Sequence, residues 1–166
     1  MVTVHYQYII TEIMTTDELM KLVQDIVSAS KCLNETHTYE KNALVNYACI
    51  FTHSNDEFEK MVKVTKETGH IVQETPTGPV FIIPSIITDA GNLNMLKIRK
   101  PDPKRPERGD ADFTVSDYNT FKKTYIGKPG FNIIVRPEME MIELIDPCYN
   151  VIAYYSHPIL AKVLNL

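Results

Sequence analysis

The chain has 166 residues, of which 44% are hydrophobic, and its formal net charge at pH 7 is -4. That length and composition predict one globular unit with a substantial core. An acidic balance of 17 basic to 21 acidic residues argues against a nucleic-acid-binding protein. The three cysteines form no C-x-x-C pair, which argues against a zinc knuckle or a disulfide framework.

The sequence contains neither an apolar run of ~18 residues nor a basic, apolar start of the signal-peptide kind. We therefore expect no membrane association and a cytoplasmic location.

Residues 1–40 predict an N-terminal extension of one strand and one helix. Residues 2–14 are rich in β-branched and aromatic side chains, as strands are. Thr15 and Glu18 have the spacing of a capping box, and a helix should follow and end near Lys31. Its apolar stripe must be buried against a sheet or another chain, which favours a homodimer; the stripe consists of Leu19, Leu22, Val23, Ile26 and Val27. The polar residues 32–42 predict a loop.

Residues 41–100 predict a first half with the order strand, helix, strand, strand, strand. The strands are expected at residues 43–52, 70–74, 80–88 and 93–99. Ser54 is expected to cap the helix, and Gly69 to end it by adopting a positive φ. Pro84 lies inside the third of these strands and predicts an edge or a bulge.

Residues 101–109 form a connector that is rich in proline, and residues 110–166 predict a second half with the same order of elements. Strands are expected at residues 110–115, 131–136, 139–145 and 151–156. Ser116 is expected to cap a helix that ends at Tyr125. The predicted fold class is therefore α+β, with tandem βαβββ repeats that form a cupped mixed sheet and pair to bury their open faces.

The second half resembles the vicinal oxygen chelate superfamily, which includes glyoxalases, bleomycin-resistance proteins and extradiol dioxygenases. The resemblance lies in DADFTVSDYNTF at residues 110–121, in Gly130 before a strand, and in MIELIDPCYN at residues 141–150. Cys148-Tyr149 stands where the family usually has Asp-Gly. The resemblance implies a cup with a divalent metal at its base, which acts as a Lewis acid.

The family pattern also implies four ligand positions, on the first and last strand of each half. They fall on Tyr47, Met95, Asp110 and Ala153. Because Met and Ala supply no hard donor, this set is incomplete. The sequence therefore predicts no cofactor and disfavours the divalent metal.

Several polar residues are candidates for binding a ligand in the cup. Arg108, Asp110 and Asp112 are expected at its mouth, with both carboxylates on one strand face; the alternative is a solvated start of a strand. Glu143 lies in an apolar run and needs a partner, for which Arg99 and Arg136 are candidates; the alternatives are a structural ion pair and a ligand-binding role. The remaining candidates are Tyr47, Arg99 and Tyr154. Tyr154 and its neighbour Tyr155 are expected on opposite strand faces.

Three hypotheses for the function follow. The first is a metal-independent, glyoxalase-like protein that binds a small organic molecule in its cup. The second is a metal-dependent isomerase, lyase or dioxygenase with an atypical site from Asp110, Glu143 and a histidine. The third is an interaction protein in which residues 2–31 contact another subunit, and it is compatible with the first.

Overall fold

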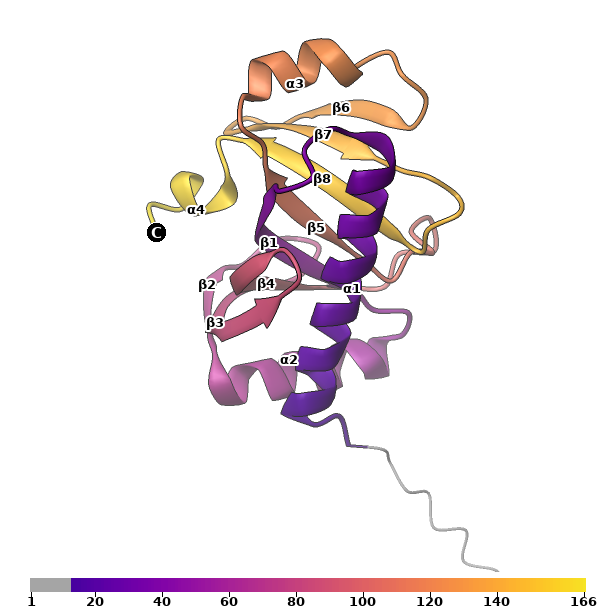
Figure 1. Cartoon of the computed structure of the whole chain (residues 1–166). Helices are drawn as coiled ribbons and strands as arrows, with labels where there is room; N and C mark the ends of the chain where they lie inside the picture. Colours follow the sequence, from indigo (N-terminus) through magenta and orange to yellow (C-terminus); the bar gives the residue numbers. More distant parts are fainter. Residues whose placement is uncertain (1–12) are drawn as a thin grey trace, which may run out of the picture.

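Eight strands form one continuous curved sheet in the computed structural model of the chain, which describes residues 13–166 (Figure 1). Their order across the sheet is β2-β3-β4-β1-β5-β8-β7-β6. The strands are β1 Leu44–Phe51, β2 His70–Gln73, β3 Val80–Thr88, β4 Gly91–Arg99, β5 Gly109–Thr114, β6 Phe131–Val135, β7 Glu140–Leu144 and β8 Val151–His157. The helices are α1 Thr16–His37, α2 Asn55–Thr68, α3 Tyr118–Tyr125 and α4 Leu160–Val163.

Each half of the sheet has the order β–α–β–β–β. The first and last strands of a half pair in parallel, β1 with β4 and β5 with β8. The halves join where β1 pairs antiparallel with β5. The predicted α+β class, with tandem βαβββ units in a cupped mixed sheet, is confirmed. Most of the strand expected at residues 2–14 lies outside the described residues.

Helix α1 packs on the sheet of its own chain and contacts strands of both halves, β1, β3, β5 and β8. The predicted capping box of Thr15 and Glu18 is confirmed. The helix continues to His37, so the predicted end near Lys31 and the predicted loop over residues 32–37 are wrong. The reason is tertiary: Leu33 is fully buried, so this polar-looking segment still contributes to the core.

A buried polar group fixes the end of α1 against β8. The Tyr155 hydroxyl donates to Asn34 Oδ1 at 2.7 Å, and the Thr38 hydroxyl donates to the same oxygen at 2.8 Å. The Asn34 amide in turn donates to the Glu40 carbonyl. Tyr155 therefore points toward α1, opposite to its neighbour Tyr154, as strand alternation predicts.

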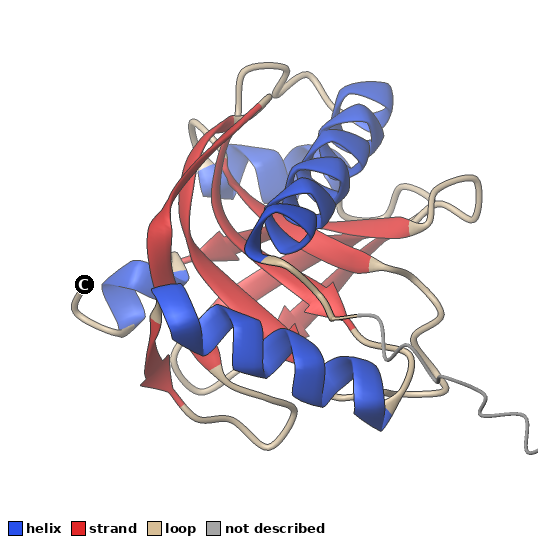
Figure 2. Ribbon diagram, turned by 90° about the horizontal axis from the view of Figure 1, so that it is seen from below, coloured by secondary structure: helices blue, strands red, loops and turns tan. Residues whose placement is uncertain are grey.

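The sheet has one covered face and one concave face. Helices α1, α2 and α3 pack on the covered face, where the main hydrophobic core lies, and Figure 2 shows the curvature of the sheet beside them. The short α4 contacts β1 from the concave side. Among the described helices, none is long and apolar enough to cross a bilayer.

Three local expectations are corrected or sharpened. Gly69 does end α2, but its φ is -121°, so the expected positive φ is wrong; a Cβ there would lie 2.5 Å from the Ile82 carbonyl oxygen. Asp117, not Ser116, caps α3 by accepting from the Thr120 N–H. The β3–β4 register shifts between Ile82 and Ile86, so the bulge predicted at Pro84 is confirmed.

We predict that Gly109→Ala weakens the junction of the two halves. Gly109 lies opposite Ile50 in β1, and a Cβ there would lie 2.3 Å from the Cys49 carbonyl oxygen and 2.9 Å from Ile26 Cδ1. Because backbone cannot move away cheaply, the free energy of unfolding should fall by about 3 kcal/mol. Denaturant unfolding measures this change.

Gly127→Ala is the matched control. No atom lies within 4 Å of its Cβ position, and only its φ of +95° is unfavourable, which costs on the order of 1 kcal/mol. A Gly109→Ala protein that is as stable as the control would contradict the close approach of β1, β5 and α1.

Candidate functional site

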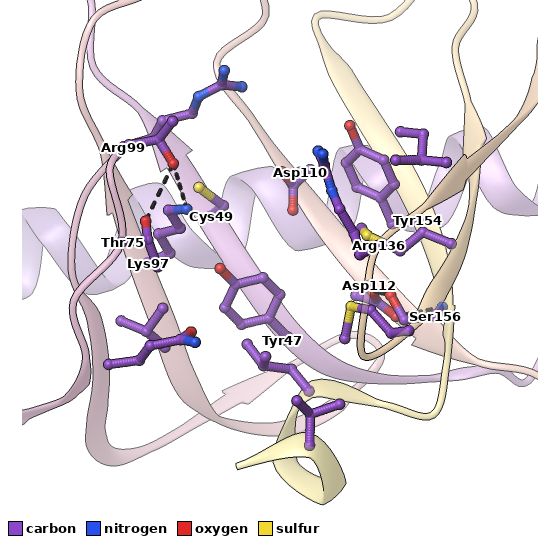
Figure 3. A pocket seen from close by; sticks show the side chains of 18 of the residues that line it. Tyr47, Cys49, Thr75, Lys97, Arg99, Asp110, Asp112, Arg136, Tyr154 and Ser156 are labelled. Carbon is purple, nitrogen blue, oxygen red and sulfur yellow. Dashed lines mark hydrogen bonds between the residues drawn. The ribbon is translucent and has the colours of Figure 1, made fainter.

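A cavity of about 600 Å³ opens on the concave face and is lined by residues from both halves (Figure 3). This volume lies within the usual range for small-molecule sites. Its floor is the β1–β5 junction. Tyr47 and Cys49 of β1 lie opposite Asp112 and Asp110 of β5, respectively, and all four line the cavity.

One wall of the cavity carries cations and hydroxyl groups. Lys97 and Arg99 come from β4, and Thr75 and Thr77 come from the segment between β2 and β3. The Lys97 ammonium donates to the Thr77 hydroxyl at 2.7 Å, which in turn lies 3.3 Å from the Thr75 hydroxyl (Figure 3). Burial, the main cause, lowers the pKa of Lys97.

The second half and the C-terminal helix supply most of the apolar lining. These side chains come from β6, from β7 with the turn before it, and from α4 with the residue after it: Ile134, Pro137, Met139, Met141, Leu160, Val163 and Leu164. The cavity is therefore amphipathic, and a ligand that fits it has a polar and an apolar part.

Asp110 is the residue of the cavity floor whose side chain has a buried atom without a hydrogen-bond partner in the described chain. It is only 6% exposed, and its Oδ1 is buried without a hydrogen-bond partner. Burial and then the neighbouring Asp112 carboxyl raise its pKa well above the usual value, although Lys97 opposes that change. Burial therefore shifts this carboxyl toward its protonated form.

Asp112, by contrast, has several partners. Its Oδ1 accepts from the Asn46 amide and from the Ser156 N–H, both at 3.2 Å, and its Oδ2 accepts from the Ser156 hydroxyl. Burial nevertheless raises its pKa to about 6, and the hydrogen bonds from Ser156 and Asn46 oppose the rise. Ser156, two residues after Tyr154, reaches the floor because alternate residues of β8 share a face.

Glu143 and Tyr154 form a connected pair at the side of the cavity. The Tyr154 hydroxyl donates to Glu143 Oε2 at 2.7 Å, and the Arg105 guanidinium donates to the same oxygen at 3.2 Å. Burial is the main cause that raises the pKa of Tyr154. The expected partners of Glu143, Arg99 and Arg136, are both wrong. Arg105 could not be predicted as a partner, because it lies in the irregular connector.

Arg99 and Arg108 have other partners. Arg99 donates to Asp102 at 2.9 Å, and its guanidinium carbon lies 5.0 Å from the centre of the Phe51 ring. Arg108 donates to Glu57 of α2 at 2.6 Å and to the Phe51 carbonyl at 3.0 Å. Arg108 does not line the cavity, so its expected position at the mouth of the cup is wrong.

The structure brings most of the predicted candidates to one place, while their binding role stays a prediction. Glu143 lies behind Tyr154, and five candidates line the cavity: Tyr47, Arg99, Asp110, Asp112 and Tyr154. Sequence reasoning missed Cys49 and Lys97, although both lie two residues from a candidate on the same strand. It also missed α4, because a short apolar tail carries no sign of where it docks.

The donor atoms at the cup do not fit the divalent metal that the family resemblance implies. Of the four positions expected to hold ligands, Ala153 packs in the core on the covered face, and Met95 does not line the cavity. None of the histidines within residues 13–166 lines the cavity. Within residues 13–166, no group of three or more His, Cys, Asp or Glu side chains is placed to hold a metal ion.

Comparisons with known proteins show a similar fold and little else. No protein-family model and no curated protein matches the sequence. A structural-genomics target, Protein EC4020, superposes with a TM-score of 0.71 over 99% of this chain and 97% of its own, at 11% identity. A triple mutant of 4-hydroxymandelate synthase from Streptomyces coelicolor covers 74% of this chain and 50% of its own, with a TM-score of 0.36 and 11% identity. The chain therefore has the fold of Protein EC4020 over nearly its whole length.

We predict that the Asp112 carboxyl titrates near pH 6. Its folded pKa of about 6 exceeds the ordinary 3.8, so the folded state binds more protons than the unfolded state between these values. Stability from this group is therefore lost as the pH rises from about 4 to about 6, with a full effect of about 3 kcal/mol. NMR of the side-chain carboxyl carbon measures the midpoint.

Ser156→Ala should move that midpoint upward, because it removes a hydroxyl that donates to the ionised carboxyl. Thr114→Ala serves as a control, since Thr114 contacts the Asn46 amide and not Asp112. A titration midpoint at the ordinary aspartate pKa in the unsubstituted protein would contradict the burial of the Asp112 carboxyl in the cavity floor.

Proposed function

We propose that this chain is a divergent member of the vicinal oxygen chelate superfamily that binds a small organic molecule in its cup without a metal. The paired βαβββ order of the two halves supports the superfamily. The amphipathic cavity on the concave face supports the binding role. The donor set at the floor argues against a resident metal.

The single observation that carries the binding role is the carboxyl of Asp110. A buried polar atom without a partner costs about 1–3 kcal/mol, and such groups are rare in folded proteins. Asp110 Oδ1 is such an atom, and its side chain lines a cavity rather than the packed core. A ligand with a polar group supplies the missing hydrogen bond, so the stability lost at this position serves binding.

The metal-dependent enzyme is the less supported alternative. It required Asp110, Glu143 and a histidine in one site. The Glu143 carboxylate already accepts from Tyr154 and Arg105, and no histidine of the part of the chain that the structure describes lines the cavity. The homodimer stays a prediction, and the stripe of α1 no longer argues for it, because α1 packs on its own sheet.

A thermal-shift screen of small organic compounds in the presence of EDTA tests the proposal. Compounds that bind the cup should raise the unfolding temperature, because a ligand that binds only the folded state stabilises it by mass action. The same compounds should lose their effect in Asp110→Leu. Elemental analysis accompanies the screen. Stoichiometric metal together with binding or an activity that EDTA abolishes would contradict the proposal.

A pair of isosteric substitutions tests whether the buried Asp110 carboxyl lowers the free energy of unfolding. Asp110→Asn removes a desolvated carboxyl with an unpaired oxygen, so the free energy of unfolding at neutral pH should stay equal or rise. Asp112→Asn places an amide where three donors point at a carboxylate, so it loses part of these hydrogen bonds and should stabilise the fold less than Asp110→Asn does. Denaturant unfolding compares them. A greater loss in Asp110→Asn would assign Asp110 to the fold instead.

A further inference from the structure

Lys97 is a cation of the cavity that forms no salt bridge within the described chain. Its ammonium is half-buried and donates to a neutral hydroxyl, that of Thr77. Within the described chain, no carboxylate oxygen lies within 4.0 Å of it. A desolvated charge is costly until an opposite charge compensates it. This ammonium is therefore a site for an anion.

The other cations at the cavity are already neutralised or solvated. Arg99 pairs with Asp102, and Arg105 pairs with Glu143. Arg136, just beyond the end of β6, also lines the cavity and forms no salt bridge within the described chain, but it is exposed to solvent, where water screens its charge. Of these two cations without a carboxylate partner, Lys97 is the less exposed.

The strand register places this ammonium in a row with Asp110. Cys49 of β1 is the register partner of Lys97 in β4 on one side and of Asp110 in β5 on the other. Two steps across a sheet separate the backbones of Lys97 and Asp110 by roughly 10 Å. The small Cys49 side chain lies between them, and all three side chains line the cavity (Figure 3).

We propose that the ligand of this cavity is a small organic monocarboxylate whose carboxylate lies above Cys49, between the Lys97 ammonium and the Asp110 carboxyl. This inference rests on the proposed binding function and names its ligand class. The ammonium supplies the opposite charge, and the carboxyl supplies a hydrogen bond to the second oxygen of the ligand. The apolar body of the ligand then contacts the side chains of Met139, Met141 and α4.

The raised pKa of Asp110 is compatible with an anionic partner. Burial raises this pKa, and in its neutral form the carboxyl is an O–H donor that does not repel a carboxylate. The half-buried Lys97 ammonium balances one negative charge. For the second charge of a phosphate dianion only the exposed Arg136 guanidinium remains, and an amine ligand would face Lys97 as a like charge.

Matched sets of ligands test which charge on the ligand the cavity binds, and isothermal titration calorimetry measures their affinities. Each set shares one apolar body, such as a phenylalkyl or a short alkyl chain, and carries a carboxylate, a primary amide, an amine or a phosphate. The intact protein should bind the carboxylate at least about tenfold more tightly than the amide of the same body. It should bind the phosphate and the amine more weakly than the carboxylate.

Lys97→Met should bring the affinity for the carboxylate down to that for the amide, since Met retains the length without the charge. Lys100→Met is the matched control, because Lys100 is exposed just beyond the end of β4, and it should bind as the intact protein does. If Lys97→Met fails to fold, the carboxylate-to-amide ratio in the intact protein still decides the question.

The outcomes separate this inference from the proposed function. Equal or tighter binding of amides, amines or phosphates would overturn the monocarboxylate, while leaving the cup as a site for organic molecules. An unchanged carboxylate preference in Lys97→Met would also overturn it. If no ligand of these sets binds and no compound in the screen with EDTA stabilises the protein, both the ligand class and the proposed function are overturned.

Discussion

The antiparallel pairing of β1 with β5 is the constraint on which the rest of the structure depends. It joins two β–α–β–β–β halves into one sheet, and it sets which side chains face each other across the junction. Gly109 permits the close approach of the strands, since a Cβ there would meet the backbone of Cys49. Helix α1 spans both halves on the covered face and so holds the junction from behind.

The same pairing creates the chemistry of the concave face. Strand alternation leaves Asp110 and Asp112 on the open side, where burial raises the pKa of both. A folded chain accepts such groups where they contribute to binding, because the cost of burying them is offset by the rest of the core. Asp112 is satisfied by Ser156 and Asn46, whereas Asp110 has an oxygen without a partner. Of the two, Asp110 is therefore the group that a ligand completes.

Local patterns in the sequence predicted the fold well, because caps and period-two alternation act over a few residues. The caps at Thr15 and Ser54 are present, and the alternation that placed Asp110 beside Asp112 also places Tyr154 opposite to Tyr155. Features that depend on distant contacts were not predictable. The polar end of α1 is helical because Leu33 and Asn34 are buried, and Arg105 reaches Glu143 from a connector without regular structure.

The most direct test of the central claim is a crystal structure of the protein soaked with phenylacetate in the presence of EDTA. We predict density for the carboxylate above Cys49, in contact with Lys97 and Asp110, and for the ring against Met139 and Met141. Both contacts follow from the register of β1 with β4 and β5. A cavity that holds only water, or one in which the anion lies at exposed Arg136 and not at Lys97, would contradict the account.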